Sequence, residues 1–325
     1  MFSDFLSPSV ADIQDADAIA LLQRLQRQVI QVPFKQRSTV MVPDRPIFCR
    51  QDSPIATATA YFHTSGKLSD VPILLLHGFD SSLLEFRYLL PLLVNHHKTW
   101  ALDCYGSGFT AYNPHLAVNP HTIRQHLLGA IATLINKPVI LVGASLGGAI
   151  AMDFAQHFPE WVRSLVLINS VGFSGHFPLG QFLPQPLLEI GADWLYLRKQ
   201  IALNAASALS MNESVIDALR CSRLHQEMPG WKEAVSSFSQ SEGYSDLCDR
   251  ISHVSHPTLV VWGENDDVLG TADAVRFEQA ILESQLVWIR GAGHAPHLDQ
   301  PQAVAEHLLT FAQGLKNTTD VKLMD

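Results

Sequence analysis

The sequence predicts an α/β fold with a mostly parallel sheet of eight strands, covered by helices on both faces and interrupted by one helical insertion. Apolar runs of strand length alternate with helix-like segments from residue 71 to 170, and the alternation resumes at residue 257. Between about 171 and 250 it fails, because apolar helical segments joined by proline-rich turns fill that stretch. With 325 residues and 47% hydrophobic content, the chain is long enough for one large core that carries an insertion.

The N-terminal part is predicted to be an extension with one helix. Residues 1–15 look loose, whereas residues 16–30 place aliphatic side chains at helical spacing between glutamines and arginines. Three short runs of β-type residues follow at 39–42, 47–49 and 56–62. We expect these runs to form an antiparallel edge.

The remaining core elements follow from apolar periodicity. Strands are expected at 71–76, 99–103, 138–143, 164–168, 257–262 and 285–289, and helices at 83–94, 121–135, 187–197, 214–224 and about 301–315. They divide the chain into an N-terminal extension (1–37), a first core part (38–170), a helical cap insertion (171–250), a second core part (251–315) and a polar, frayed tail (316–325).

One stretch in the middle of the chain carries the chemistry. The strand at 138–143 runs into Gly143-Ala144-Ser145-Leu146-Gly147, and small and apolar residues that suit a packed helix follow at once. A serine at the tip of such a turn has a strained backbone, so the residues two before and two after it must be small. The pentapeptide predicts a nucleophile elbow. A Walker loop is excluded because no Lys-Ser or Lys-Thr pair follows Gly148.

Two later turns supply partners for Ser145. The strand at 257–262 ends in Gly263-Glu264-Asn265-Asp266-Asp267, and the strand at 285–289 ends in Gly291-Ala292-Gly293-His294. Because both turns lie at the carboxyl edge of a parallel sheet, as Ser145 does, the three groups can converge. His297 is an alternative to His294, but the flanking glycines favour His294.

The chain resembles the α/β-hydrolase superfamily, in the capped branch with a serine nucleophile that includes esterases, thioesterases and pheophytinase-like proteins. The resemblance covers residues 71–311 and includes the order serine, acid, histidine. Its motifs are His77-Gly78-Phe79, Asp103-Cys104-Tyr105-Gly106-Ser107-Gly108, the elbow, Gly263-Glu264-Asn265-Asp266 and Gly291-Ala292-Gly293-His294. The resemblance implies an α/β-hydrolase fold, but the cap matches no pattern that identifies the substrate.

The resemblance also implies roles for the site residues. Ser145 would attack an ester-like bond and form an acyl-enzyme, with His294 as general base and Asp266 as the acid that orients it. Asp267 is expected to turn away. Asn169 stands where some relatives carry the acid, and it cannot hold that charge. Dehalogenases and epoxide hydrolases use aspartate at the elbow, so the serine argues against both activities.

The oxyanion hole is expected to consist of the Phe79 and Leu146 amides. His77 would bond the loop that shapes this hole, and Asp103 would form a turn; neither is expected to be catalytic. No cofactor or metal is implied, and the remaining histidines, such as His115, His121 and His126, are expected to be solvated or capping residues. A C–C bond hydrolase and a small-molecule receptor with little turnover remain open alternatives.

The cap holds an unusually apolar segment at 173–195. Its large side chains are Phe173, Phe177, Phe182, Leu183, Leu187, Leu188, Trp194 and Leu195. The simplest explanation is that they pack the cap onto the core. Alternatively, some of them line the substrate pocket, and Phe173, Phe177, Phe182 and Trp194 are the candidates. That alternative predicts a preference for medium-length or aromatic acyl groups.

Composition limits the cellular compartment and the binding partners to be expected. The net charge of −9 argues against nucleic-acid binding and leaves a small molecule as the expected partner. Cys49, Cys104, Cys221 and Cys248 are scattered without metal-like spacing, which is typical of a reduced, cytoplasmic protein. No signal-peptide pattern or membrane-spanning run is found. Peripheral membrane contact and the oligomeric state stay open.

Overall fold

The computed structural model describes residues 2–32, 38–42, 45–49, 53–61, 69–175 and 182–321. An eight-stranded sheet forms its centre, in the order β1-β4-β6-β5-β7-β8-β9-β10. Its strands are β1 (Leu25–Val32), β4 (Ser53–Tyr61), β5 (Ser69–Leu76), β6 (His97–Leu102), β7 (Val139–Ala144), β8 (Val162–Ile168), β9 (Thr258–Gly263) and β10 (Ser284–Ile289). β4 is antiparallel to both β1 and β6, and the other pairings are parallel. The predicted mostly parallel sheet is therefore confirmed.

The central strands are mostly apolar because helices cover both faces of the sheet. In β5, Ile73 and Leu75 belong to one core cluster, while Leu74 and Leu76 belong to the other. Successive side chains of a strand point to opposite faces, so a strand buried on both faces cannot alternate apolar with polar residues.

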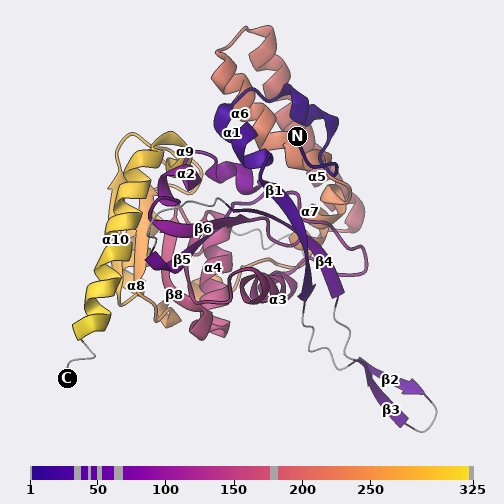
Figure 1. Ribbon diagram of the computed structural model, residues 1–325. Helices are drawn as coiled ribbons and strands as arrows, with labels where there is room; N and C mark the ends of the chain where they lie inside the picture. Colours follow the sequence, from indigo (N-terminus) through magenta and orange to yellow (C-terminus); the bar gives the residue numbers. More distant parts are fainter. Residues whose placement is uncertain are drawn as a thin grey trace.

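Each face of the sheet has its own set of helices (Figure 1). One core includes residues of α1 (Ala16–Leu22), η2 (Leu83–Phe86), α2 (Leu90–Leu93) and α10 (Pro301–Val321). The other includes residues of α3 (Pro120–Ala130), α4 (Leu146–His157) and α8 (Ala272–Ala280). The last helix was predicted to end near residue 315, but it continues to Val321.

The described part of the insertion is helical. Its main elements are α5 (Gln185–Ala208), α6 (Glu213–Arg223), η6 (Leu224–Glu227) and α7 (Trp231–Gln240), and α5 contacts both α6 and α7. We call residues 185–240 the cap. In Figure 1 the cap lies beside the N-terminal segment and α1.

Two expectations for the N-terminal part are wrong. The predicted helix over 16–30 ends at Leu22, and Leu25–Val32 form β1 instead. Every residue of Leu25–Val32 pairs with a residue of β4, so pairing between distant segments overrides the helical spacing. The described residues 2–15 are also not loose, because η1 (Pro8–Asp12) and buried Leu6, Val10 and Ile13 pack into the core.

The three β-type runs expected to form one antiparallel edge are strands, but they belong to two different sheets. β2 (Ser38–Val42) and β3 (Arg45–Cys49) pair with each other in a separate two-stranded sheet. β4 joins the main sheet between β1 and β6. Among the described residues, no helix is both long enough and apolar enough to cross a membrane.

Candidate active site

Ser145 lies at the tip of the turn between β7 and α4. Its backbone has φ 50° and ψ −116°, a conformation that L-residues rarely adopt. The turn is fixed on both sides, since the Ser145 amide donates to the Ile168 carbonyl at 2.9 Å and its carbonyl accepts from Val171 at 3.1 Å. The structure thus holds the side chain of Ser145 in the geometry that the elbow motif predicts.

The two glycines of the motif are required by contact as well as by conformation. A Cβ on Gly143 would lie 2.2 Å from the Gly147 carbonyl oxygen, and a Cβ on Gly147 would lie 2.1 Å from the Leu76 carbonyl oxygen. Both separations are far below van der Waals contact. α4 can therefore start directly against β5 and β7 only without side chains at these two positions.

The expected partners of Ser145 converge on it. His294 Nε2 lies 3.1 Å from Ser145 Oγ, and His294 Nδ1 lies 3.1 Å from each carboxylate oxygen of Asp266. The three groups form a continuous hydrogen-bonded chain although they come from the ends of three different strands. This arrangement can move a proton from the hydroxyl to the imidazole while the carboxylate fixes the ring.

Asp266 is held ionised by a set of donors. Its Oδ1 accepts from the amides of Val268 and Leu269, and its Oδ2 accepts from Asn169 Nδ2 at 2.7 Å. Burial acts to raise the pKa of Asp266, but the hydrogen bonds from Asn169, Val268, His294 and Leu269 outweigh it and lower the pKa. The carboxylate stays charged at neutral pH.

The sequence indicates only that Asn169 cannot serve as the carboxylate that orients the histidine. In the structure it links the end of β8 to β9, the strand that carries Asp266, because its Oδ1 also accepts from the Gly263 amide at 3.1 Å. Its φ of 40° is one that asparagine tolerates. The position that could have held the acid therefore orients the acid of the neighbouring strand.

The alternative residues lie away from the proton path. Asp267 is exposed, as expected, and binds none of the described residues through its carboxylate. His297 is buried, and its Nε2 lies 3.0 Å from Glu85 Oε1. His77 Nδ1 lies 2.8 Å from the Gly78 carbonyl oxygen, and the carboxylate of Asp103 accepts from turn amides. These contacts agree with structural roles for His77 and Asp103.

The two residues whose amides are expected to form the oxyanion hole, Phe79 and Leu146, line the same cavity as Ser145. Gly78 approaches the serine closely, since a Cβ at Gly78 would lie 3.3 Å from Ser145 Cβ. Neither the Phe79 nor the Leu146 amide donates a hydrogen bond to another described residue. Leu146 is also the first residue of α4, where the helix dipole favours negative charge.

The sequence did not single out Glu85, which shapes the same loop. Its Oε2 accepts from the Gly78 amide at 2.9 Å while Oε1 contacts His297. Burial acts to raise the pKa of Glu85, but the bonds from His297 and Gly78 lower it to about 2. A buried carboxylate thus fixes the residue before Phe79.

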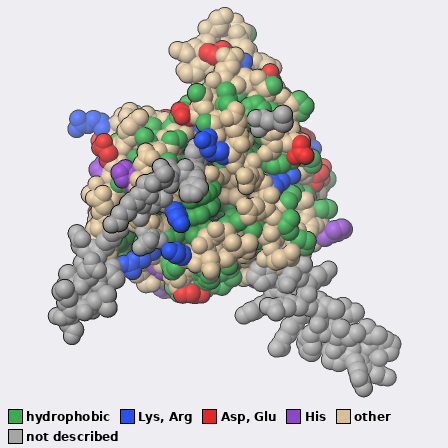
Figure 2. All heavy atoms as spheres, viewed as in Figure 1, with side chains coloured by type: hydrophobic (Ala, Val, Ile, Leu, Met, Phe, Trp, Pro, Cys, Tyr) green, Lys and Arg blue, Asp and Glu red, His purple; other side chains and the backbone are tan. Residues whose placement is uncertain are grey.

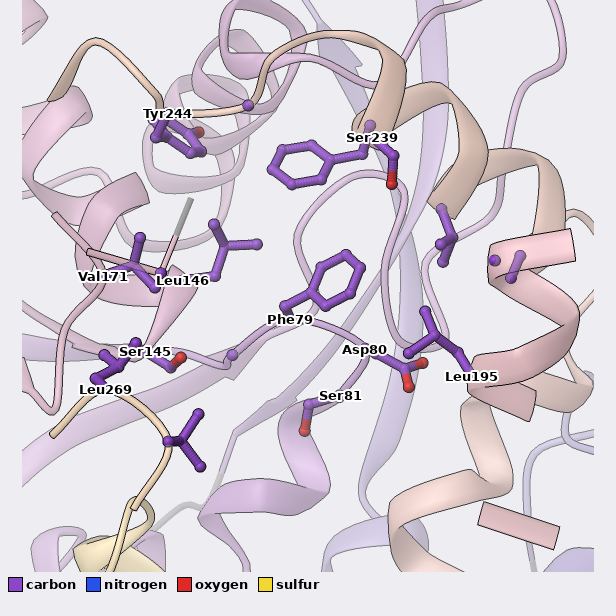
Figure 3. Close-up of a pocket in the computed structure, with 18 of the residues that line it drawn as sticks. Phe79, Asp80, Ser81, Ser145, Leu146, Val171, Leu195, Ser239, Tyr244 and Leu269 are labelled. Atoms are coloured by element: carbon purple, nitrogen blue, oxygen red, sulfur yellow. The ribbon is translucent and has the colours of Figure 1, made fainter. Parts of the chain in front are cut away.

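A cavity of about 760 Å³ opens above Ser145, between the core and the cap. Ser145 and His294 lie in its wall with Phe79 and Leu146 (Figure 3). Most of the other lining side chains are apolar, among them Val171, Leu183, Leu187, Leu188, Leu195, Val235, Phe238, Val268, Leu269 and Leu298. Its polar lining residues include Asp80, Ser81, Glu85, Arg198 and Lys199. The volume is within the range of small-molecule sites.

The four aromatic pocket candidates do not line this cavity where they are described. Phe173 packs against Phe277 with ring centroids 5.1 Å apart and lies under the Arg276 guanidinium. Phe182 is 74% exposed and Trp194 is 61% exposed, and neither is among the residues that line the cavity. Phe177 lies outside the described residues. Leucines of the same apolar segment form the wall instead, because α5 turns that face toward Ser145.

His126 corrects another expectation, because it is fully buried rather than solvated. Its Nδ1 accepts from the Tyr105 amide at 3.2 Å and its Nε2 lies 2.7 Å from Thr57 Oγ1. Burial lowers the pKa of His126 to about 3. Within the part of the chain that the structure describes, no group of three or more His, Cys, Asp or Glu side chains is arranged to hold a metal ion.

Sequence comparison agrees with the fold and the site geometry. The family model described as the Alpha/beta hydrolase family matches residues 73–307. The chain belongs to this family. It is 33% identical over 322 residues to the Alpha/beta hydrolase domain-containing protein VTE7 of Arabidopsis thaliana, a match that covers 96% of this chain and 91% of that protein. The likeness therefore extends beyond the matched family region into the N-terminal part.

Two further relatives have named activities. The chain is 28% identical to the 2-hydroxy-6-oxo-2,4-heptadienoate hydrolase of Pseudomonas putida, over 70% of this chain and 84% of that protein. It is 26% identical to a pimeloyl-[acyl-carrier protein] methyl ester esterase of Vibrio vulnificus, over 78% of this chain and 97% of that protein. This alpha/beta-hydrolase family member is thus related to hydrolases of different substrate classes.

Proposed function

We propose that the protein is a serine hydrolase that cleaves an ester-like bond of a small, apolar substrate through an acyl-enzyme on Ser145. The observation that carries this proposal is the position of His294, which lies within 3.1 Å of both Ser145 Oγ and the Asp266 carboxylate. Cleavage of an ester requires a nucleophile, a base and hydrogen-bond donors for the oxyanion. The residues proposed for these roles all line the cavity: Ser145, His294, Phe79 and Leu146.

The reaction proceeds in two halves. His294 Nε2 takes the Ser145 proton as Oγ attacks the carbonyl carbon, and Asp266 holds the Nδ1–H tautomer and stabilises the imidazolium. The Phe79 and Leu146 amides bind the oxyanion, and each such donor is typically worth about 3 kcal/mol. His294 then protonates the leaving alcohol, and water activated by the same imidazole hydrolyses the acyl-enzyme.

The cavity supports an apolar acyl or alcohol group. Each buried CH₂ adds up to about 0.8 kcal/mol until the apolar wall is covered. We expect kcat/KM to rise from two carbons to medium-length acyl chains on p-nitrophenyl esters. A flat profile, or one that falls steadily from acetate, would contradict an apolar acyl site.

A C–C bond hydrolase is the second candidate, favoured by the relationship to the Pseudomonas putida hydrolase. Turnover of a vinylogous 1,5-diketone in place of the p-nitrophenyl series would favour it. A receptor is the third, and it predicts one slow turnover with a large thermal shift on ligand binding. Rapid multiple turnover of an ester would exclude the receptor.

The proposed setting is a reducing compartment such as the cytoplasm. The thiols of Cys104, Cys221 and Cys248 are free, and two of them are buried. On the face shown in Figure 2, acidic and basic side chains are interspersed rather than gathered by sign. Together with the net charge of −9, this distribution supports a small molecule rather than a nucleic acid as the partner.

A further inference from the structure

Asp80 belongs to the core by sequence but to the cap by its contacts. It directly follows Phe79, whose amide is the proposed oxyanion donor, in the loop after β5. Its side chain is only 1% exposed, and its backbone has φ 49°. A buried carboxylate in a left-handed backbone conformation requires strong partners, since both features are costly without them.

Three cap segments supply those partners. From α5, Lys199 Nζ lies 2.9 Å from Asp80 Oδ2 and donates to the Asp80 carbonyl oxygen at 2.7 Å. From η6, Gln226 Nε2 lies 3.0 Å from both carboxylate oxygens and His225 Nε2 lies 3.1 Å from Oδ1. From the start of α7, Trp231 Nε1 donates to Oδ1 at 3.2 Å. The cap therefore converges on one core residue.

These contacts keep Asp80 charged. Burial acts to raise the pKa of Asp80, but the His225 and Gln226 hydrogen bonds and the Lys199 charge outweigh it and lower the pKa to about 2. Burial lowers the pKa of His225 to about 4, so at neutral pH the cations that pair with Asp80 are Lys199 at 2.9 Å and, more distantly, Arg198 at 4.0 Å. If the cap moved away, the ion pair and the carbonyl contact would be lost together.

The loop is thus anchored on both sides of the Phe79 amide. On the core side, Glu85 accepts from the Gly78 amide. On the cap side, Asp80 is bound as described, and the Phe79 ring lies 6.1 Å from the Phe238 ring of α7. In Figure 3 the Asp80 carboxylate points from the loop toward the cap helix that carries Leu195.

We propose that Asp80 is a positioning residue that couples the seating of the cap to the direction of the Phe79 amide, so that the oxyanion hole is complete only with the cap in place. The proposal rests on the proposed hydrolase function. It adds that the cap contributes to transition-state stabilisation as well as to the pocket wall.

The test compares Asp80→Gly with Asp217→Asn. Glycine tolerates the backbone conformation at position 80 but removes every side-chain contact with the cap. Asp217 is a buried carboxylate of α6 that accepts from the Gln14 and Asp15 amides and has no contact with the oxyanion loop. Each variant removes a buried carboxylate that joins the cap to the rest of the protein, but only Asp80 is adjacent to Phe79.

We expect Asp80→Gly to lower kcat about ten- to a hundred-fold with KM changed less than about threefold, short of the 10²–10³ typical for losing an oxyanion donor outright. Binding of an alkyl boronic acid, which mimics the tetrahedral intermediate, should weaken by a similar factor. Asp217→Asn should lower the melting temperature and leave kcat within about threefold. Equal kcat for Asp80→Gly and the wild type, or an equal loss in both variants, would overturn the proposal.

Three further experiments distinguish the possible outcomes. Hydrogen exchange of the 78–82 amides should accelerate in Asp80→Gly and not in Asp217→Asn; unchanged exchange would overturn the coupling. If Asp80→Gly does not fold, the double variant Asp80→Asn with Lys199→Met leaves neither charge unpaired, and the same kcat loss is expected. Labelling of wild-type Ser145 by a fluorophosphonate tests the hydrolase itself, so its failure would refute the proposed function rather than this coupling.

Discussion

Replacing Asp266 by asparagine should nearly abolish turnover, because no orientation of the new amide fits the site. If its NH₂ took the place of Oδ1, it would face the amide donors of Val268 and Leu269. If it took the place of Oδ2, it would face the Asn169 NH₂ at 2.7 Å. Asn169 cannot turn its amide round without leaving the Gly263 N–H unpaired.

The magnitude follows from the tautomer of His294. An NH₂ beside Nδ1 favours the imidazole with its proton on Nε2, which donates to Ser145 Oγ instead of accepting its proton. The same change in serine proteases lowers kcat about 10⁴-fold, and we expect a similar loss here. The donor–donor contact should also cost about 1–3 kcal/mol of stability.

The matched control is the neighbouring carboxylate. Asp267→Asn removes the same charge from an exposed position, and kcat should stay within about threefold. The assay is steady-state hydrolysis of a p-nitrophenyl ester together with urea unfolding of each variant. A crippled Asp267→Asn enzyme beside an active Asp266→Asn enzyme would refute the assignment of the acid.

Three further changes probe the elbow and the core. Ser145→Ala should abolish ester turnover and fluorophosphonate labelling without changing the melting temperature by more than a few degrees; retained activity in the purified variant would refute the nucleophile assignment. Gly147→Ala should destabilise by about 3 kcal/mol or more, since its Cβ would lie 2.1 Å from the Leu76 carbonyl oxygen. Gly314→Ala should instead stabilise α10 by up to about 1 kcal/mol, because a Cβ added there would meet no atom of the described residues within 4 Å; urea unfolding compares the two variants. His126 has a pKa of about 3 in the folded protein against the ordinary histidine pKa of 6.5, so the unfolded state takes up the proton first and stability is lost as pH falls from 6.5 toward 3. At pH 5 the loss is about 2 kcal/mol, and His126→Gln should remove that part of the pH dependence of the unfolding free energy.

The sequence alone determined the sheet, the elbow and the order of the site residues. A strand buried on both faces must be apolar throughout, and a strand-to-helix turn this tight must have glycine at 143 and 147, so both leave a local pattern. Ser145, Asp266 and His294 could be proposed because each follows a strand of the parallel sheet, while the choice of Asp266 over Asp267 came from the family resemblance.

Only the tertiary structure decided what surrounds that site. Leu25–Val32 became a strand because β4 offered a partner, which no spacing within residues 16–30 could reveal. Where α5 meets the pocket, the wall is made of Leu187, Leu188 and Leu195 rather than Trp194, since the rotation of α5 on the core decides which side chains face inward. Glu85 and Asp80 carry no sequence signal, and the sequence marked Asn169 only as a position that cannot supply the acid, because the roles of all three depend on contacts with distant segments. Hydrogen bonds between segments far apart in sequence form only after the chain has folded, so the groups that position the site are visible only in three dimensions.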